Sequence, residues 1–158
     1  KVHEPLAFYA AYFSIRAKAF DSTVMCQGMD ALLRKRQEIR AKEKDATAVE
    51  EDMLVTMEVC YEFYLRGFAF APIDLYRSHA TLFQMDAEKK SLLPPFTSIP
   101  GLGETAAWSI AENREGRAFI SVEEFLAACP KVSKTHVEQL KQSGALGELP
   151  ETSQMSLF

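Results

Sequence analysis

The segment Ile99-Pro100-Gly101-Leu102-Gly103-Glu104-Thr105-Ala106-Ala107-Trp108-Ser109-Ile110 places a Pro-Gly-x-Gly turn directly before residues with helical spacing. Glycine allows a backbone to approach a ligand closely, because it carries no side chain. Unpaired N–H groups and the helix dipole make the start of such a helix an anion site that needs no lysine. The segment therefore predicts a turn and helix that can hold a phosphate.

Two other interpretations of this segment are open. Its sequence also matches the dinucleotide-binding fingerprint G-x-G-x-x-A. In that fingerprint the turn follows a buried strand, and an acidic residue ends a second strand about 20 residues later. Here Pro94, Pro95 and Pro100 precede the turn, and Glu123 and Glu124 belong to a capping box that opens another helix. A purely structural turn between two helices is the second alternative. The sequence favours a phosphate-binding helix-hairpin-helix over both.

A second helix start of this kind follows downstream. The segment Lys131-Val132-Ser133-Lys134-Thr135 leads into an amphipathic helix that ends at Gly144, with Ser133 as the expected N-cap. Lys131 and Lys134 flank that cap, so this start either faces a second phosphate or carries ordinary surface charge. Two anion-binding helix starts would suit the backbone of a nucleic-acid duplex.

The beginning of the chain predicts a helix that is apolar on nearly every face. It follows Pro5, which suits a first helical turn, and extends to Ile15. Such a helix has to be buried all round, so we expect covering elements upstream of Lys1, where the chain looks cut from a larger parent. An internal helix of a self-contained bundle is the alternative.

Two further helices are expected before residue 67. Apolar residues recur at helical spacing from Ser22 to Lys44, with basic residues on the other faces. That basic side is either solvated or able to contact phosphate. A capping box, Thr47 to Glu50, opens the next helix, which stops at Gly67 and can form an antiparallel hairpin with the preceding one.

Short strands are expected after Gly67. The candidates are Phe68 to Phe70, Ile73 to Leu75, Thr81 to Asp86 and Ser91 to Leu93, with one hairpin among them. Two prolines at 94 and 95 close this segment because neither can donate to a ladder. We place a domain boundary near residues 94–96.

The composition is that of an ordinary globular domain. The 158 residues carry 18 Lys+Arg against 22 Asp+Glu, a net charge of −4, and the pI is near 5.5. No global positive field draws the chain to nucleic acid, so any such contact must be local. No apolar run is long enough for a membrane span. Cys26, Cys60 and Cys129 are odd in number and far apart, which indicates reduced core thiols in the cytoplasm.

Chemistry-bearing clusters are scarce. No Asp-x-Asp pair of the kind that holds Mg²⁺ occurs, and Glu50, Glu51 and Asp52 fit the first turn of a helix. The histidines and cysteines lack the spacing of a zinc site or a nucleophile triad. The polar spacer from Pro150 precedes the tail Gln154-Met155-Ser156-Leu157-Phe158, whose apolar ends either lie in a partner's groove or dock on their own domain.

Taken together, the chain resembles the C-terminal end of a bacterial replicative DNA polymerase III alpha subunit of the PolC type. The resemblance covers essentially the whole chain. It is carried by Lys1 to Tyr9, Ile73 to Ser78, Leu93 to Phe96, Ile99 to Gly103, Lys131 to Thr135 and Ser156 to Phe158. Pro-Gly-x-Gly alone would point equally to repair nucleases or ligases.

The resemblance implies a mainly α fold, with a helical fingers segment and a small β-hairpin at 1–95, a tandem helix-hairpin-helix that holds primer-template duplex at 96–149, and a flexible clamp-binding tail at 150–158. The implied DNA-binding residues are Pro100, Gly101, Leu102, Gly103, Thr105, Ala106, Lys131, Ser133, Lys134 and Thr135. The implied residues that bind the sliding clamp are Gln154, Met155, Ser156, Leu157 and Phe158, with Met155 where leucine is more usual.

The same resemblance places the catalytic aspartates and Mg²⁺ of this nucleotidyltransferase in a palm upstream of Lys1. The fragment should therefore bind no cofactor, polymerise no DNA alone, and reside in the cytoplasm at the nucleoid and replisome. Gly101→Val is expected to weaken duplex binding while the fold survives. The alternatives are a noncatalytic protein-interaction scaffold, a DNA-repair helix-hairpin-helix module and, third, a dehydrogenase-like enzyme.

Overall fold

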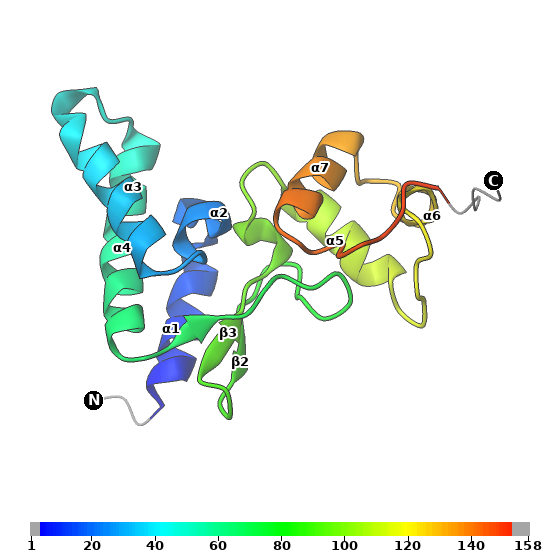
Figure 1. The fold of residues 1–158 in the computed structure, drawn as a ribbon, viewed down its shortest axis with the longest axis horizontal. Helices are drawn as coiled ribbons and strands as arrows, with labels where there is room; N and C mark the ends of the chain where they lie inside the picture. Colours follow the sequence, from blue (N-terminus) through cyan, green and yellow to red (C-terminus); the bar gives the residue numbers. More distant parts are fainter. Residues whose placement is uncertain (1–3, 153–158) are drawn as a thin grey trace.

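The structure is a computed structural model that describes residues 4–152, a mainly helical chain with one small sheet (Figure 1). The α-helices are α1 (Pro5–Ile15), α2 (Ser22–Met25), α3 (Met29–Ala41), α4 (Ala48–Leu65), α5 (Glu104–Asn113), α6 (Val122–Ala128) and α7 (Lys134–Gln142). Short 3₁₀ helices are η1 (Ala17–Ala19), η2 (Glu43–Asp45) and η3 (Phe96–Ser98), and the strands are β1 (Ala69–Phe70), β2 (Gln84–Asp86) and β3 (Ser91–Leu93). The predicted fold class is confirmed.

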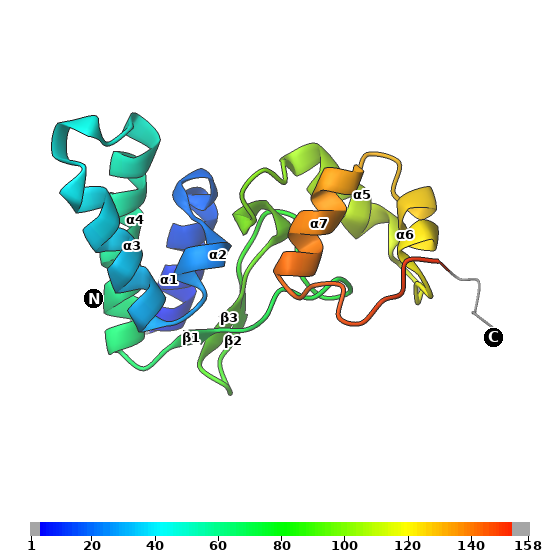
Figure 2. The same cartoon turned by 45° about the horizontal axis from the view of Figure 1, so that its top comes forward.

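Helices α3 and α4 form the expected antiparallel hairpin, which projects at one end of the molecule (Figures 1 and 2). The predicted capping box is present, since Thr47 Oγ1 accepts from Glu50 N and Glu50 Oε1 accepts from Thr47 N. The prediction of one helix over 22–44 is wrong. Gly28 has φ +99°, a conformation that ends a helix, and it separates α2 from α3.

Helix α1 buries one face only. Leu6, Tyr9 and Phe13 are buried against α4 and the sheet, whereas Phe8 is 46% exposed and Ile15 is 83% exposed. The expectation that elements upstream of Lys1 cover the remaining faces of this helix stays a prediction. A nearly uniform apolar sequence does not identify its buried face, because that face is chosen by the elements that pack on it.

The sheet has the strand order β1-β3-β2. Strands β2 and β3 form the predicted hairpin, whereas β1 pairs with β3 in parallel, with Ala69 opposite Ser91. The expected strand over Ile73 to Leu75 is absent from the described structure. Asp74 Oδ1 instead accepts from the backbone N–H groups of Tyr76 and Arg77 and makes a tight turn there.

The described chain packs around two hydrophobic clusters. The first joins α1 to α4 with the sheet, and the second surrounds α5, α6 and α7. After β1 the chain enters the second cluster, where Ile73 and Ala80 are buried. It then returns to the first cluster, where Phe83 and Leu92 are buried. The chain then crosses again to Phe96, so it passes between the clusters three times. The boundary at residue 95 stays a prediction.

Candidate nucleic-acid interface

The first hairpin consists of η3, the turn Ile99 to Gly103, and α5. Leu102 N donates to Ile99 O at 3.1 Å, and Ala107 N donates to Gly103 O at 3.0 Å. The Leu102 side chain is 3% exposed and lies in the second cluster. Because that side chain and the side chain of Ala106 are buried, these two predicted site residues can offer a ligand only their backbone.

The N-terminus of α5 is open. Gly103 is the N-cap and provides no side-chain hydrogen bond. Within residues 4–152, no protein acceptor is found for the N–H groups of Glu104, Thr105 and Ala106. Apart from Gly103 and its two chain neighbours, no heavy atom of the described structure lies within 4 Å of the position that a Cβ on Gly103 would take. An anion can therefore approach these donors without displacing protein atoms.

The two glycines of the turn have different roles. Gly101 has φ +85°, and a Cβ there would lie 2.3 Å from Gln139 Nε2 on α7. Gly103 has φ −79° and ψ 175°, which any residue can adopt. Gly101 thus allows the turn to pack against α7, and only Gly103 borders open space. The expectation that Gly101→Val leaves the fold intact is not supported by this geometry.

The second hairpin repeats the first in its hydrogen bonds. Val132 N donates to Cys129 O at 3.0 Å, and Val137 N donates to Ser133 O at 3.1 Å. Ser133 has φ −97° and ψ 172°, nearly the angles of Gly103. The turn Cys129 to Ser133 is therefore the structural counterpart of Ile99 to Gly103, and the tandem arrangement expected from the sequence is present.

The second helix start differs because a capping box occupies part of it. Ser133 is the predicted N-cap, and its Oγ accepts from His136 N, while Ser133 N donates to His136 Nδ1 at 3.1 Å. A histidine replaces the usual Glu or Gln, so the motif was missed from the sequence. In the described structure the N–H groups of Lys134 and Thr135 remain without a protein acceptor.

The structure brings part of the predicted site together. Lys131 N donates to Ser109 Oγ on α5 at 3.4 Å, and Thr105 and Lys131 line one pocket of about 330 Å³. Lys134 lines a different pocket, whose other members include Glu123, Glu138 and Glu151. The loop that precedes α7 therefore lies against α5, and Lys131 shares a pocket with Thr105 in the first turn of that helix.

Sequence reasoning missed Trp108, which lines the same pocket as Thr105 and Lys131. Its side chain is 40% exposed, and its ring lies edge-on to His79 with centroids 5.3 Å apart. The sequence feature that could have identified Trp108 is a large aromatic residue close to a predicted anion-binding helix start.

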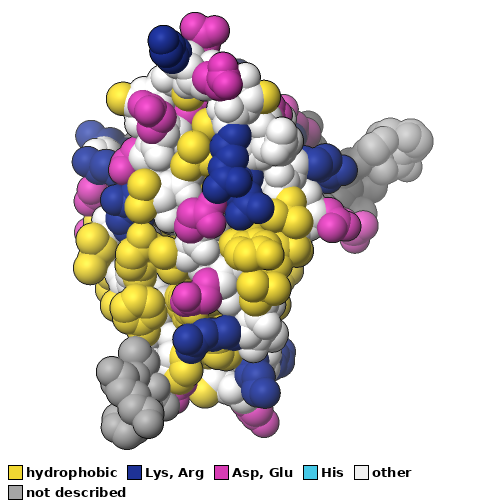
Figure 3. Space-filling model, turned by 90° about the vertical axis from the view of Figure 1, so that its left-hand side faces the viewer, with side chains coloured by type: hydrophobic (Ala, Val, Ile, Leu, Met, Phe, Trp, Pro, Cys, Tyr) yellow, Lys and Arg dark blue, Asp and Glu magenta, His cyan; other side chains and the backbone are white. Residues whose placement is uncertain are grey.

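The basic side of α3 is partly neutralised by α4. Arg36 and Arg40 both reach Glu58, at 3.4 and 2.8 Å, and Lys42 pairs with Glu50. Seen from this end, the molecule carries basic and acidic side chains side by side, with hydrophobic side chains beside and between them (Figure 3). This arrangement favours the alternative of a solvated face over a phosphate contact.

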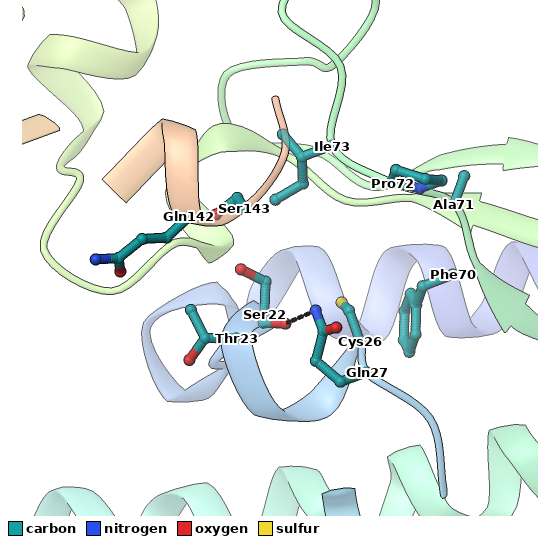
Figure 4. Close-up of a pocket in the computed structure, with 10 residues that line it drawn as sticks. All are labelled: Ser22, Thr23, Cys26, Gln27, Phe70, Ala71, Pro72, Ile73, Gln142 and Ser143. Carbon is teal, nitrogen blue, oxygen red and sulfur yellow. Dashed lines mark hydrogen bonds between the residues drawn. The ribbon is translucent and has the colours of Figure 1, made fainter. Parts of the chain in front are cut away.

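A pocket of about 390 Å³ lies between the two clusters, where α2 faces the end of α7 (Figure 4). The hydroxyl of Ser22 points toward Ser143 in this pocket and has no hydrogen-bond partner in the described structure. All of the lining residues are uncharged. The pocket therefore lacks the Lys and Arg side chains that bind phosphate where no helix N-terminus is available.

The cysteines are free thiols in the structure. Burial raises the pKa of Cys129 to about 11 and raises the pKa values of Cys26 and Cys60 as well, so all three are protonated near neutral pH. No group of three or more His, Cys, Asp or Glu that could hold a metal ion occurs in residues 4–152. In that same part of the chain, every helix is too short or too polar to cross a membrane. The predicted clamp-binding residues 154–158 lie outside the described residues.

Comparison with known proteins agrees with this geometry. The chain is 46% identical to DNA polymerase III PolC-type from Bacillus cereus over 158 residues, which is all of this chain and 11% of that relative. It is 45% identical over 160 residues to the protein of the same name from Streptococcus pneumoniae and 46% identical over 158 residues to that from Bacillus subtilis, again with all of this chain and 11% of each relative.

These similarities confirm the resemblance predicted from the sequence, and the chain spans about a tenth of the length of the curated relatives it matches. The family of the helix-hairpin-helix motif matches residues 67–155, more than half of the chain and both hairpins. The chain therefore belongs to the helix-hairpin-helix motif family.

Proposed function

We propose that this chain holds double-stranded primer-template DNA through contacts to phosphate, as the C-terminal part of a replicative DNA-directed DNA polymerase. The observation that carries the proposal is the open start of α5, with three N–H groups and free space at Gly103. Lys131 lines the same pocket as Thr105 in the first turn of this helix. Backbone donors and a helix dipole favour an oxygen anion over a base edge. Binding should therefore be indifferent to DNA sequence.

Two hairpins of the same turn geometry support a duplex over a single phosphate ion. Their turns share the same hydrogen-bond pattern, and the second also offers two free N–H groups at Lys134 and Thr135. A chain with a net charge of −4 cannot rely on long-range attraction to DNA, so short-range donors have to provide the affinity. We expect few phosphate contacts and a correspondingly shallow dependence on salt.

The polymerase context comes from the relatives, which are named DNA polymerase III PolC-type. In this proposal the metal-binding aspartates and Mg²⁺ belong to the palm of the parent chain, and this fragment positions DNA without performing nucleotidyl transfer. It would contact the palm and the rest of the fingers, and it would act in the cytoplasm at the replisome.

The tail Gln154 to Phe158 is proposed to bind the sliding clamp, as the family resemblance implies. Deleting these residues should abolish binding to the clamp and leave the affinity for duplex unchanged. Isothermal titration with purified clamp and a parallel DNA titration would check both. Loss of both activities together would contradict a separate role for the tail.

Fluorescence anisotropy of a labelled random-sequence primer-template, titrated with the chain at two salt concentrations, tests duplex binding. The logarithm of the affinity should fall with the logarithm of salt, with a slope of about −0.9 for each phosphate contacted. A folded sample that binds no duplex at low salt would overturn the proposal and favour a protein-interaction scaffold.

A further inference from the structure

An exposed tryptophan lies one helical turn beyond the open start of α5. Trp108 is three residues after Thr105, so both lie on one face of the helix, about 5 Å apart along its axis. The indole is 40% exposed. A phosphate held at Gly103 to Thr105 would place the sugar and base of the same nucleotide within reach of this ring.

The ring is held in place from behind. His79 lies edge-on to Trp108 with centroids 5.3 Å apart. His79 Nδ1 accepts hydrogen bonds from the backbone N–H groups of Thr81 and Leu82, each at 3.0 Å. The imidazole is thus fixed by the loop that carries it, and the indole has a rigid neighbour on one side and a pocket on another.

The pocket beside Trp108 has the chemistry of a base site. It measures about 330 Å³, and besides Trp108 and Lys131 it includes Glu112 and Asn113. Asn113 Nδ2 donates to Ser109 O at 2.7 Å, which leaves its carbonyl oxygen available as an acceptor. Glu112 is exposed and repels phosphate, but its carboxylate can accept from the exocyclic amino group of cytosine or adenine.

We propose that Trp108 stacks on an unpaired base of a single-stranded DNA overhang next to the bound duplex, with Glu112 accepting from the amino group of that base. Stacking on an aromatic ring needs an exposed base face, and in a duplex the neighbouring pairs cover that face. This inference rests on the proposed duplex binding, because the phosphate at the start of α5 sets the position of the nucleotide.

The chain offers a direct probe, since Trp108 is its only tryptophan. The experiment compares a blunt duplex with the same duplex carrying a short single-stranded cytidine overhang, and records anisotropy of the DNA and fluorescence of the indole together. The overhang should increase affinity about 5- to 150-fold, the range that one stacked base contributes. It should also quench Trp108, which the blunt duplex should not do.

Variants separate this role from general binding. Trp108→Leu should remove the difference in affinity between the overhang DNA and the blunt duplex. Ile120→Ala alters another exposed hydrophobic side chain, 60% exposed, and should preserve the difference. Glu112→Gln should reduce the preference for a cytidine overhang over a thymidine overhang, because thymine has no exocyclic amino group.

The outcomes are distinguishable. If both DNAs bind equally and the indole signal does not respond to the overhang, this inference is overturned while duplex binding stands. If neither DNA changes its anisotropy, duplex binding itself fails, and the base site fails with it. If Trp108→Leu still binds the overhang DNA more tightly than the blunt duplex, the single strand binds at another surface, and this inference is overturned.

Discussion

Replacing Gly103 with aspartate should stabilise the protein and weaken DNA binding at the same time. Gly103 is the N-cap of α5, its backbone angles suit any residue, and the position of its Cβ is open. An aspartate there can accept from the free N–H groups of the first turn and adds a negative charge at the positive end of the helix. The carboxylate would occupy the site that we assign to phosphate.

The magnitudes follow from these two effects. Exchanging a glycine cap for aspartate contributes a few tenths of a kcal/mol, and the favourable dipole adds about 0.3–1 kcal/mol. We expect a gain of about 1 kcal/mol and a rise in Tm of about 2–4 °C for a chain of this size. Loss of one charge-assisted phosphate contact should weaken duplex binding about 10- to 100-fold and reduce the salt slope by about 0.9.

Thermal unfolding and duplex anisotropy on the same preparation measure both effects. Gly103→Asn provides a neutral cap of the same shape and should lose less affinity than the aspartate variant. Gln37→Glu adds the same charge on an exposed position of α3 and should leave binding nearly unchanged. Undiminished binding by a stabilised Gly103→Asp protein would refute the assignment of this helix start to phosphate.

Gly101→Ala should lower the free energy of unfolding by more than the roughly 1–2 kcal/mol expected for a left-handed residue. The matched control is Gly144→Ala, where φ is +79° and a Cβ meets no atom within 4 Å. In urea unfolding the Gly101 variant should therefore lose more stability than the Gly144 variant. Lys131→Ala should reduce the salt slope of duplex binding by about 1. Arg40 is already paired with a carboxylate of α4, so Arg40→Ala should leave the slope unchanged. Equal slopes in the two variants would contradict the assigned interface. Burial raises the pKa of Tyr9 to about 12, above its value near 10 in an unfolded chain. The contribution of Tyr9 to stability is therefore constant below pH 10 and is lost as the pH rises from about 10 to 12, so in urea unfolding the loss of stability over this range should be less steep in Tyr9→Phe.

Local signals predicted the hairpins well. The turn Ile99 to Gly103, the cap at Ser133 and the capping box at Thr47 depend on residues within a few positions of each other, and all are present. Candidate phosphate donors could therefore be named from the sequence. Their neighbours could not, because the approach of Gly101 to Gln139 joins residues far apart in the chain.

Nonlocal pairing explains the other differences. Nothing near Ala69 in the sequence indicates that it pairs in parallel with Ser91, since a two-residue strand carries almost no periodicity. The basic stripe of α3 could not be assigned either, because the pairing of Arg36 and Arg40 depends on Glu58 on the facing helix. Charge patterns on one helix do not identify an interface until the partner helix is known.

The three crossings of the chain between its two hydrophobic clusters have a mechanical consequence. Two of these crossings leave β1 and β3, which lie in parallel and are tied by the bond from Ala71 N to Leu92 O at 2.8 Å. Three segments of the chain therefore connect the clusters and share any pulling force between them. Twisting about one segment is opposed by the other two. A single proteolytic cut between the clusters would leave them attached, and a force applied to the hairpins would also load the helices at the opposite end of the molecule.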